Sequence, residues 1–169
     1  MKRNTTIFIV VLGMFVLYAI SSYNGLISLD EEVNEKWAQV QNVYQRRLDL
    51  IPNLVNTVKG YAAHERETLE AVINARASAT KISPEALQGA LSNPQAMQNF
   101  DAAQSALSSA LSKLMVVVER YPELKANENF LALQSQLEGT ENRITVERKR
   151  FNEVVREYNK KVRRFPAGL

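Results

Sequence analysis

The sequence predicts an all-α protein, in which an N-terminal transmembrane helix is followed by an up-and-down antiparallel bundle of four long helices. Uncharged residues run without interruption from Asn4 to Leu29. Beyond them, apolar residues recur at every third or fourth position almost to the end of the chain, as on one face of a helix. Six glycines and five prolines among 169 residues are too few for the many turns of an all-β protein. We assign residues 1–23 to a cytoplasmic tip and membrane anchor, and residues 24–169 to a helical bundle domain.

The uncharged N-terminal stretch is predicted to cross a membrane and to contact lipid through residues 5–23. As a helix this segment is roughly 29 Å long, which matches a hydrocarbon core about 30 Å thick. Lys2 and Arg3 precede it, and Asp30 is the first acidic residue after it. The positive-inside rule then predicts a cytoplasmic N-terminus and a bundle on the other side of the membrane. The alternative is a cleaved signal peptide with Ala19-Ile20-Ser21 as its small-x-small site.

Four helical segments follow from the spacing of apolar residues and from the residues that interrupt it. Their predicted ranges are 23–50, 53–81, 95–121 and 127–164. Asn93-Pro94 is predicted to open the third segment, since proline suits the first turn of a helix. Tyr121-Pro122 is predicted to end it, because the residue before a proline is disfavoured in the α conformation. Ser83-Pro84 predicts a short additional helix, and Phe165-Pro166 predicts the end of the fourth segment.

Pro52 decides how the first two segments are connected. A proline inside a helix lacks an amide hydrogen, and its ring clashes with the carbonyl four residues earlier, here that of Leu48. A reversal of the chain at Pro52 makes the first three segments nearly equal in length, as an antiparallel bundle requires. We therefore predict a helix reversal at Pro52. The alternative is a three-helix bundle with a first helix kinked at Pro52.

Two charged residues interrupt the predicted apolar faces. Arg47 follows Val40 and Tyr44 at helical spacing, and Glu141 falls on the apolar face of the fourth segment. If the first and fourth segments are antiparallel with Tyr23 level with Phe165, Arg47 lies level with Glu141. We predict a partly buried Arg47–Glu141 pair that fixes the register of the helices. The alternative is that both side chains extend to the surface.

The residues that could carry catalysis do not form a known motif. The sequence has no cysteine and one histidine, His64, and His64-Glu65 is followed by Thr68 where a zinc-binding HExxH motif requires a second histidine. Nucleophile-elbow, phosphate-binding and dinucleotide-binding motifs are also missing. After Arg3 the charges nearly balance, so nucleic acid is not expected as a partner. We predict no enzymatic activity, no cofactor, no metal and no small-molecule substrate.

Residues spread over nearly the whole chain carry a family resemblance. They are Tyr23-Asn24-Gly25-Leu26, Trp37-Ala38-Gln39-Val40, 46–55, 58–65, 121–130, 137–144, Tyr158-Asn159 and Arg164-Phe165-Pro166. With these motifs behind an N-terminal anchor, the chain resembles the LemA family. The resemblance implies a bacterial, membrane-anchored, up-and-down helical bundle with no established enzymatic activity, and some members are linked to specialised membranes such as magnetosomes. We therefore expect a single-pass protein of the bacterial cytoplasmic (inner) membrane.

The expected function is that of a non-enzymatic scaffold or interaction protein of the bacterial cell envelope. Regular apolar faces readily pair between chains, so we expect a homo-oligomer or a membrane-protein partner. One alternative is an accessory or regulatory subunit of a membrane protease or signalling complex. Another is an enzyme that works through His64. The residues that we consider for interactions are Trp37, Tyr44, Tyr61 and His64.

Overall fold

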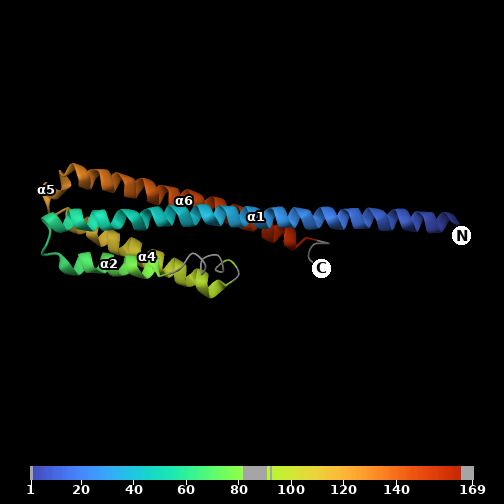
Figure 1. The fold of residues 1–169 in the computed structure, drawn as a ribbon, viewed down its shortest axis with the longest axis horizontal. Helices are drawn as coiled ribbons and strands as arrows, with labels where there is room; N and C mark the ends of the chain where they lie inside the picture. The colour runs from blue at the N-terminus through green and yellow to red at the C-terminus, as the bar shows by residue number, and fades with distance from the viewer. Residues whose placement is uncertain (1, 82–90, 92, 165–169) are drawn as a thin grey trace. The chain divides into compact units, whose positions relative to one another are not determined.

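The computed structural model describes residues 2–81, 91 and 93–164, and side chains from residue 7 onward (Figure 1). Its helices are α1 (Lys2–Tyr61), α2 (Arg66–Thr80), α4 (Pro94–Val118), α5 (Pro122–Lys125) and α6 (Glu128–Val162). None of the described residues forms a strand. The predicted all-α helical bundle is therefore confirmed. The predicted short helix at Ser83-Pro84 and the stop at Phe165-Pro166 lie outside the described residues.

The chain divides into two compact units that are not consecutive in sequence. A paired-helix unit comprises Met1–Val43 and Arg143–Leu169, and a four-helix unit comprises Tyr44–Asn142. Both α1 and α6 contribute to each unit. These units do not follow the predicted boundary between residues 23 and 24, which stays a prediction.

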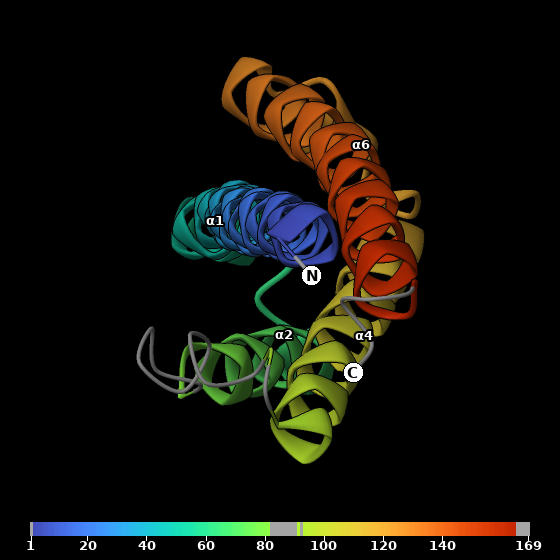
Figure 2. The same cartoon turned by 90° about the vertical axis from the view of Figure 1, so that its right-hand side faces the viewer.

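The four-helix unit packs four long segments around one apolar interior: the end of α1, all of α2 and α4, and the beginning of α6. The short helix α5 also lies in this unit and contributes Leu124 to the interior. Successive long helices run in opposite directions (Figure 1), and the end-on view places them around a common centre (Figure 2). The most completely buried apolar side chains of this core come from every helix of the unit: Ile51, Leu54, Val58, Val72, Leu107, Leu114, Leu124 and Phe130. Burial of these side chains is the main force that holds the unit together.

The predicted reversal at Pro52 is wrong, because α1 continues through this proline to Tyr61. The chain reverses instead at residues 62–65, where the amide of Ala62 donates to Val58 at 2.8 Å and the amide of Glu65 donates to Ala62 at 3.0 Å. The alternative of a first helix that passes Pro52 describes α1 better. It does not describe the remainder, since α2 follows as a separate antiparallel helix.

A side chain from α2 explains why α1 tolerates Pro52. The missing amide hydrogen of Pro52 deprives the Leu48 carbonyl of its helical donor. The Nε atom of Arg76 on α2 donates to this carbonyl at 2.9 Å. The local penalty that predicted a reversal is thus reduced by a contact between two helices, which sequence spacing does not reveal.

Local residue chemistry fixes the beginnings of α4 and α6. The Asn93 side chain accepts hydrogen bonds from the amides of Gln95 at 3.0 Å and Ala96 at 3.3 Å, and Pro94 occupies the first turn. This confirms the predicted opening of the third segment. Asn127 serves α6 similarly, since its side chain accepts from the amide of Phe130 at 3.0 Å.

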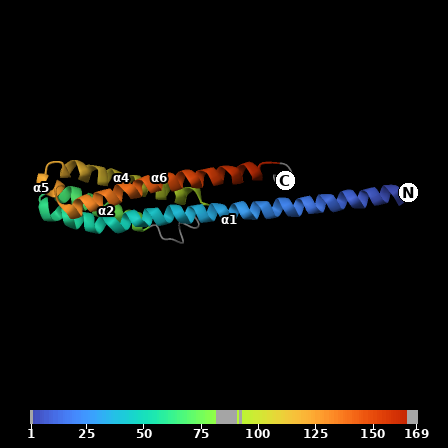
Figure 3. The same ribbon diagram turned by 90° about the horizontal axis from the view of Figure 1, so that it is seen from above.

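The paired-helix unit places the first part of α1 beside the last part of α6 (Figure 3). Trp37 and Phe151 pack with their ring centroids 5.2 Å apart. Val40 of α1 and Ile144 of α6 are also buried. Near the end of α6, a Cβ atom at position 25 of α1 would collide with the Lys161 ammonium group, so Gly25 leaves space for this side chain.

Candidate functional site: a buried arginine network

Arg47 lies in the interior of the four-helix unit, although an ionised side chain is rarely so deeply buried. Its side chain is 2% exposed, and Cζ lies 5.1 Å from the centroid of the Tyr44 ring. Tyr44 in turn meets Phe100 edge-on at 5.0 Å between centroids. The position follows from helical spacing, because Arg47 projects from the same face of α1 as Tyr44 and Ile51.

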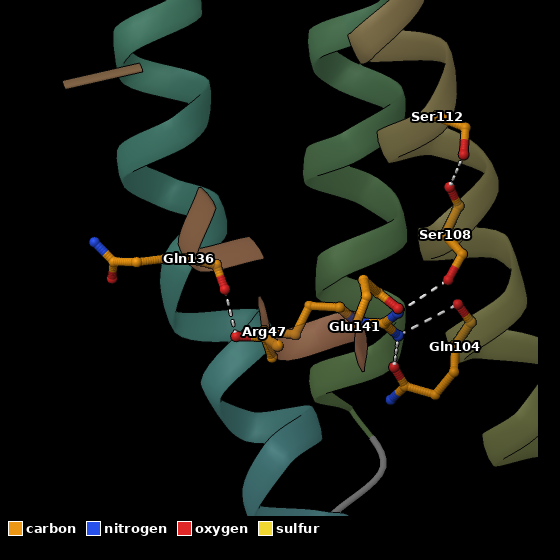
Figure 4. Close-up of polar contacts among 7 residues, drawn as sticks. Arg47, Gln104, Ser108, Ser112, Gln136 and Glu141 are labelled. Carbon is orange, nitrogen blue, oxygen red and sulfur yellow. Dashed lines mark hydrogen bonds and ion pairs between the residues drawn. The ribbon is translucent and has the colours of Figure 1, made fainter. Parts of the chain in front are cut away.

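Polar groups from two other helices surround the guanidinium group (Figure 4). Its Nη1 atom donates to Glu141 Oε1 on α6 at 2.7 Å and to Ser108 Oγ on α4 at 2.9 Å. Its Nη2 atom donates to the side-chain oxygen of Gln104 and, at 3.4 Å, to the carbonyl of the same residue. Arg47 therefore connects three helices through charge-assisted hydrogen bonds.

The structure thus brings the predicted pair of Arg47 and Glu141 together, but with unequal burial. The Glu141 side chain is 41% exposed, whereas the Arg47 side chain is almost completely enclosed. Arg47 does not extend to the surface, so the alternative fails for that residue. The role of this pair in fixing the register stays a prediction. Nε of Arg47 has no hydrogen-bond acceptor within the described residues.

Sequence reasoning missed Gln104, Ser108 and Arg76 as polar partners. A signal for Gln104 was present, because it falls between Phe100 and Leu107 at helical spacing on the predicted apolar face of α4. Such a polar residue requires a hydrogen-bonding partner when it is buried, and Gln104 is 4% exposed. Ser108 and Arg76 had no comparable signal.

The four residues considered for interactions occupy different environments. Trp37 and Tyr44 are buried against Phe151 and Phe100, so they belong to the interior and offer no exposed surface to a partner. Tyr61 is exposed at the end of α1, and its hydroxyl oxygen accepts from the Asn127 side chain at 3.0 Å. His64 is exposed in the turn between α1 and α2.

Next to His64, a small polar cluster joins the α1–α2 turn to the segment between α4 and α5. The Tyr121 hydroxyl donates to Glu65 Oε1 at 3.0 Å, and the Arg120 guanidinium lies 3.0 Å from the same oxygen. The hydrogen bond to Glu65 raises the pKa of Tyr121 above its usual 10.0, and Arg120 opposes this rise. This arrangement ties the turn in place. Within the described residues, no group of three or more histidine, aspartate or glutamate side chains could hold a metal ion.

The first part of α1 has the length and composition of a membrane-crossing helix, and it is the only helix of this kind in the described part of the chain. Its large apolar side chains from Ile7 to Ile20 are 48–69% exposed. They point in all directions around the helix, because they are nearly consecutive in sequence. A helix that is apolar on every side is typical of a membrane span.

Comparison with known proteins identifies related chains. Residues 36–169 match the model of the LemA family. Magnetosome protein MamQ of Magnetospirillum gryphiswaldense is 25% identical, over 90% of this chain and 61% of its own length. Magnetosome protein MamQ 2 of Paramagnetospirillum magneticum is 22% identical with the same coverage, and Protein LemA of Metamycoplasma hominis is 22% identical over 94% of this chain and 67% of its own. The chain thus spans about three-fifths of the magnetosome proteins that it matches. Because the family model covers most of its length, the chain belongs to the LemA family.

Proposed function

We propose that this chain is a membrane-anchored scaffold or interaction protein of the bacterial cell envelope that acts without catalysis. The first part of α1 anchors it in the cytoplasmic membrane, with the N-terminus in the cytoplasm. The bundle domain binds further copies of the chain or other envelope proteins. Two of its relatives are named as magnetosome proteins. The magnetosome membrane is therefore one kind of membrane on which such a protein acts.

The exposed apolar surface of α1 between Ile7 and Ile20 is the observation that carries this proposal. Twelve large apolar side chains in this stretch lack cover from the protein. Exposed apolar surfaces of such extent are unfavourable in water and mark contact with a membrane or a partner. A lipid bilayer covers all sides of a helix at once, and the helix satisfies its own backbone hydrogen bonds there.

The bundle domain supports an interaction role better than a reaction. Its most concentrated polar cluster lies around Arg47 and is enclosed by helices. Most polar groups of this cluster form hydrogen bonds with one another, so they are not available to a substrate. The exposed surface of this unit instead carries isolated large apolar side chains, among them Val116 on α4 at 70% and Leu131 on α6 at 50%. We choose these two positions as probes of partner contact, because a partner that covers the bundle would bury exposed apolar side chains of this size.

Photo-crosslinking in native membranes tests the proposal. A photoreactive residue is placed at Val116 or at Leu131 of the full chain, and at Glu70, an exposed polar position on α2, as the control. We expect membrane-retained species above the monomer mass from the two apolar positions, and weaker or no such species from Glu70. His64→Ala should leave this pattern unchanged.

Two results would contradict the proposal. Crosslinked membranes that contain only monomers would exclude the scaffold role. Release of the chain from membranes by an alkaline carbonate wash would exclude the anchor.

A further inference from the structure

The end of α6 concentrates positive charge beside the apolar part of α1. We call Lys160, Lys161, Arg163 and Arg164 the basic end. These four cations fall within five residues, and no acidic residue lies among them. Lys160 is 3.7 Å from Glu157, whereas no carboxylate in the described parts of the chain forms an ion pair with Lys161, Arg163 or Arg164. Most of the charge at the basic end is therefore available to an anion.

A groove of about 470 Å³ joins the basic end to α1. Tyr18, Ser22 and Leu29 of α1 line one side, and Glu157, Lys160, Lys161 and Arg164 line the other. Gly25 lies on α1 between these residues, and the absence of a side chain there lets the Lys161 ammonium group approach the helix. The groove thus has a cationic wall and a wall that is largely apolar.

The groove lies where the apolar surface of α1 ends. Tyr18 belongs to the exposed apolar stretch, and Ser21 and Ser22 are the first polar residues after it. In a bilayer that covers residues 7–20, this level corresponds to the phospholipid headgroups, where tyrosine is also favoured. Lysine and arginine at this level meet the phosphate groups of the lipids.

We propose that the basic end and the Tyr18–Leu29 segment of α1 form a binding site for the headgroup of an anionic phospholipid. Lys161 and Arg164 hold the phosphate by charge-assisted hydrogen bonds, and Tyr18 contacts the beginning of the acyl chains. Glu157 partly offsets Lys160 and disfavours a second anion. This site rests on the proposed function, since it requires α1 to be inserted in a membrane.

The simpler explanation is that the cations stabilise the C-terminal end of α6, where exposed carbonyl groups create a negative potential. That explanation requires no lipid and predicts no preference among lipids. The two explanations are therefore separable by measuring lipid selectivity.

The full chain is reconstituted in phosphatidylcholine vesicles with a trace of spin-labelled lipid, and the motionally restricted fraction of the label is measured by electron paramagnetic resonance. We expect labelled phosphatidylglycerol to be restricted more than labelled phosphatidylcholine. The double variant Lys161→Gln/Arg164→Gln should reduce this preference about fivefold or more, because each cation near anionic lipid contributes about 1 kcal/mol. The control Lys59→Gln/Lys113→Gln removes the same charge from exposed positions of the four-helix unit and should retain the preference.

Equal restriction of the two lipids by the wild type, or an equal loss of preference in both double variants, would overturn the headgroup site. Loss of preference only at high salt would support it, since salt screens exposed charges. A chain that an alkaline wash removes from the vesicles would overturn the anchor instead, so the failure of the site and the failure of the proposed function are distinguishable.

Discussion

At the scale of single residues, Pro52 and Arg76 form a unit although they lie on different helices. The proline removes the donor that the Leu48 carbonyl would have in a regular helix, and Arg76 supplies another at 2.9 Å. A carbonyl that is partly buried and left without a donor is unfavourable by about 1–3 kcal/mol. The energetic effect of Arg76 should therefore depend on which residue occupies position 52.

A double-mutant cycle tests this dependence. Arg76→Met should lower the free energy of unfolding by about 1–2 kcal/mol, because the Leu48 carbonyl loses its donor. In a Pro52→Ala background, Arg76→Met should lower the free energy of unfolding clearly less, since the amide of residue 52 then donates to the Leu48 carbonyl. Urea unfolding of the full chain in detergent micelles measures both values. Equal costs in the two backgrounds would show that Arg76 acts independently of the proline.

The unequal burial of Arg47 and Glu141 leads to a second prediction. Glu141→Gln leaves the enclosed guanidinium group without this counter-charge and should cost about 2–3 kcal/mol. Arg47→Met leaves a carboxylate that water can reach, but it also removes the donor from the buried Gln104 side chain, so it should lower the free energy of unfolding by about 1–3 kcal/mol. Adding Glu141→Gln to Arg47→Met should lower it little further, because the buried counter-charge is already gone. Unfolding by urea at constant salt gives the three values, and a loss in the double variant close to the sum of the two single losses would contradict the explanation.

Tyr121 predicts a specific dependence of stability on pH. Its pKa is raised in the folded state by the hydrogen bond to Glu65, so the protonated hydroxyl favours folding. This contribution is fully present below the unfolded-state pKa of about 10 and is lost as the pH rises through the higher folded-state value. Between pH 9 and about 11, the wild type should therefore lose more stability than Tyr121→Phe. Parallel unfolding slopes for the two proteins would exclude this contribution.

At the scale of helices, the sequence allowed α4 and α6 to be predicted well and α1 and α2 poorly. Asn93 and Pro94 act on their own neighbours, so a local pattern predicts the start of α4. Pro52 also acts locally, but its effect is offset by Arg76, which lies 28 residues from Leu48. The meeting of Arg47 and Glu141 was predictable because each interrupts a regular apolar face, and one antiparallel alignment places the two residues level with each other. Gln104 and Ser108 could not be assigned to Arg47 without knowing where α4 lies.

Gly139 provides a test of helix stability. It weakens α6, and no close packing at this position requires a glycine. A Cβ atom at this position would meet no other atom within 4 Å. Since glycine costs about 1 kcal/mol relative to alanine inside a helix, Gly139→Ala should raise the free energy of unfolding by about 0.5–1 kcal/mol. Gly60→Ala, near the end of α1, is the matched control and should give a smaller gain. A loss of stability in Gly139→Ala would show that the chain requires a flexible point there.

At the scale of the whole molecule, basic residues on both sides of the apolar stretch affect which side of the membrane the bundle occupies. Lys2 and Arg3 precede the apolar stretch and favour a cytoplasmic N-terminus. The basic end of α6 lies at the opposite border of this stretch, near Gly25, and its charge is greater. The two groups of cations favour opposite placements, so the side of the membrane on which the bundle lies distinguishes their contributions.

The chain has no cysteine, so a single introduced cysteine is the only thiol that can be labelled to determine the orientation. Ser105→Cys introduces a single exposed thiol on α4, and Asn4→Cys introduces one before the apolar stretch. In intact spheroplasts, a membrane-impermeant maleimide should label Cys at 105 and not at 4, and both should react after lysis. Labelling of position 4 alone in intact cells would place the bundle in the cytoplasm.

The hydrogen bond between Arg76 and Leu48 also has a consequence for biosynthesis. Arg76 is added to the growing chain 28 residues after Leu48, so the Leu48 carbonyl has no donor from α2 when this part of α1 is synthesised. The α1 helix can acquire its final hydrogen bond at this point only after α2 has been translated and has docked. Although the N-terminal segment can enter the membrane early, the last turns of the same helix reach their final hydrogen bonding later.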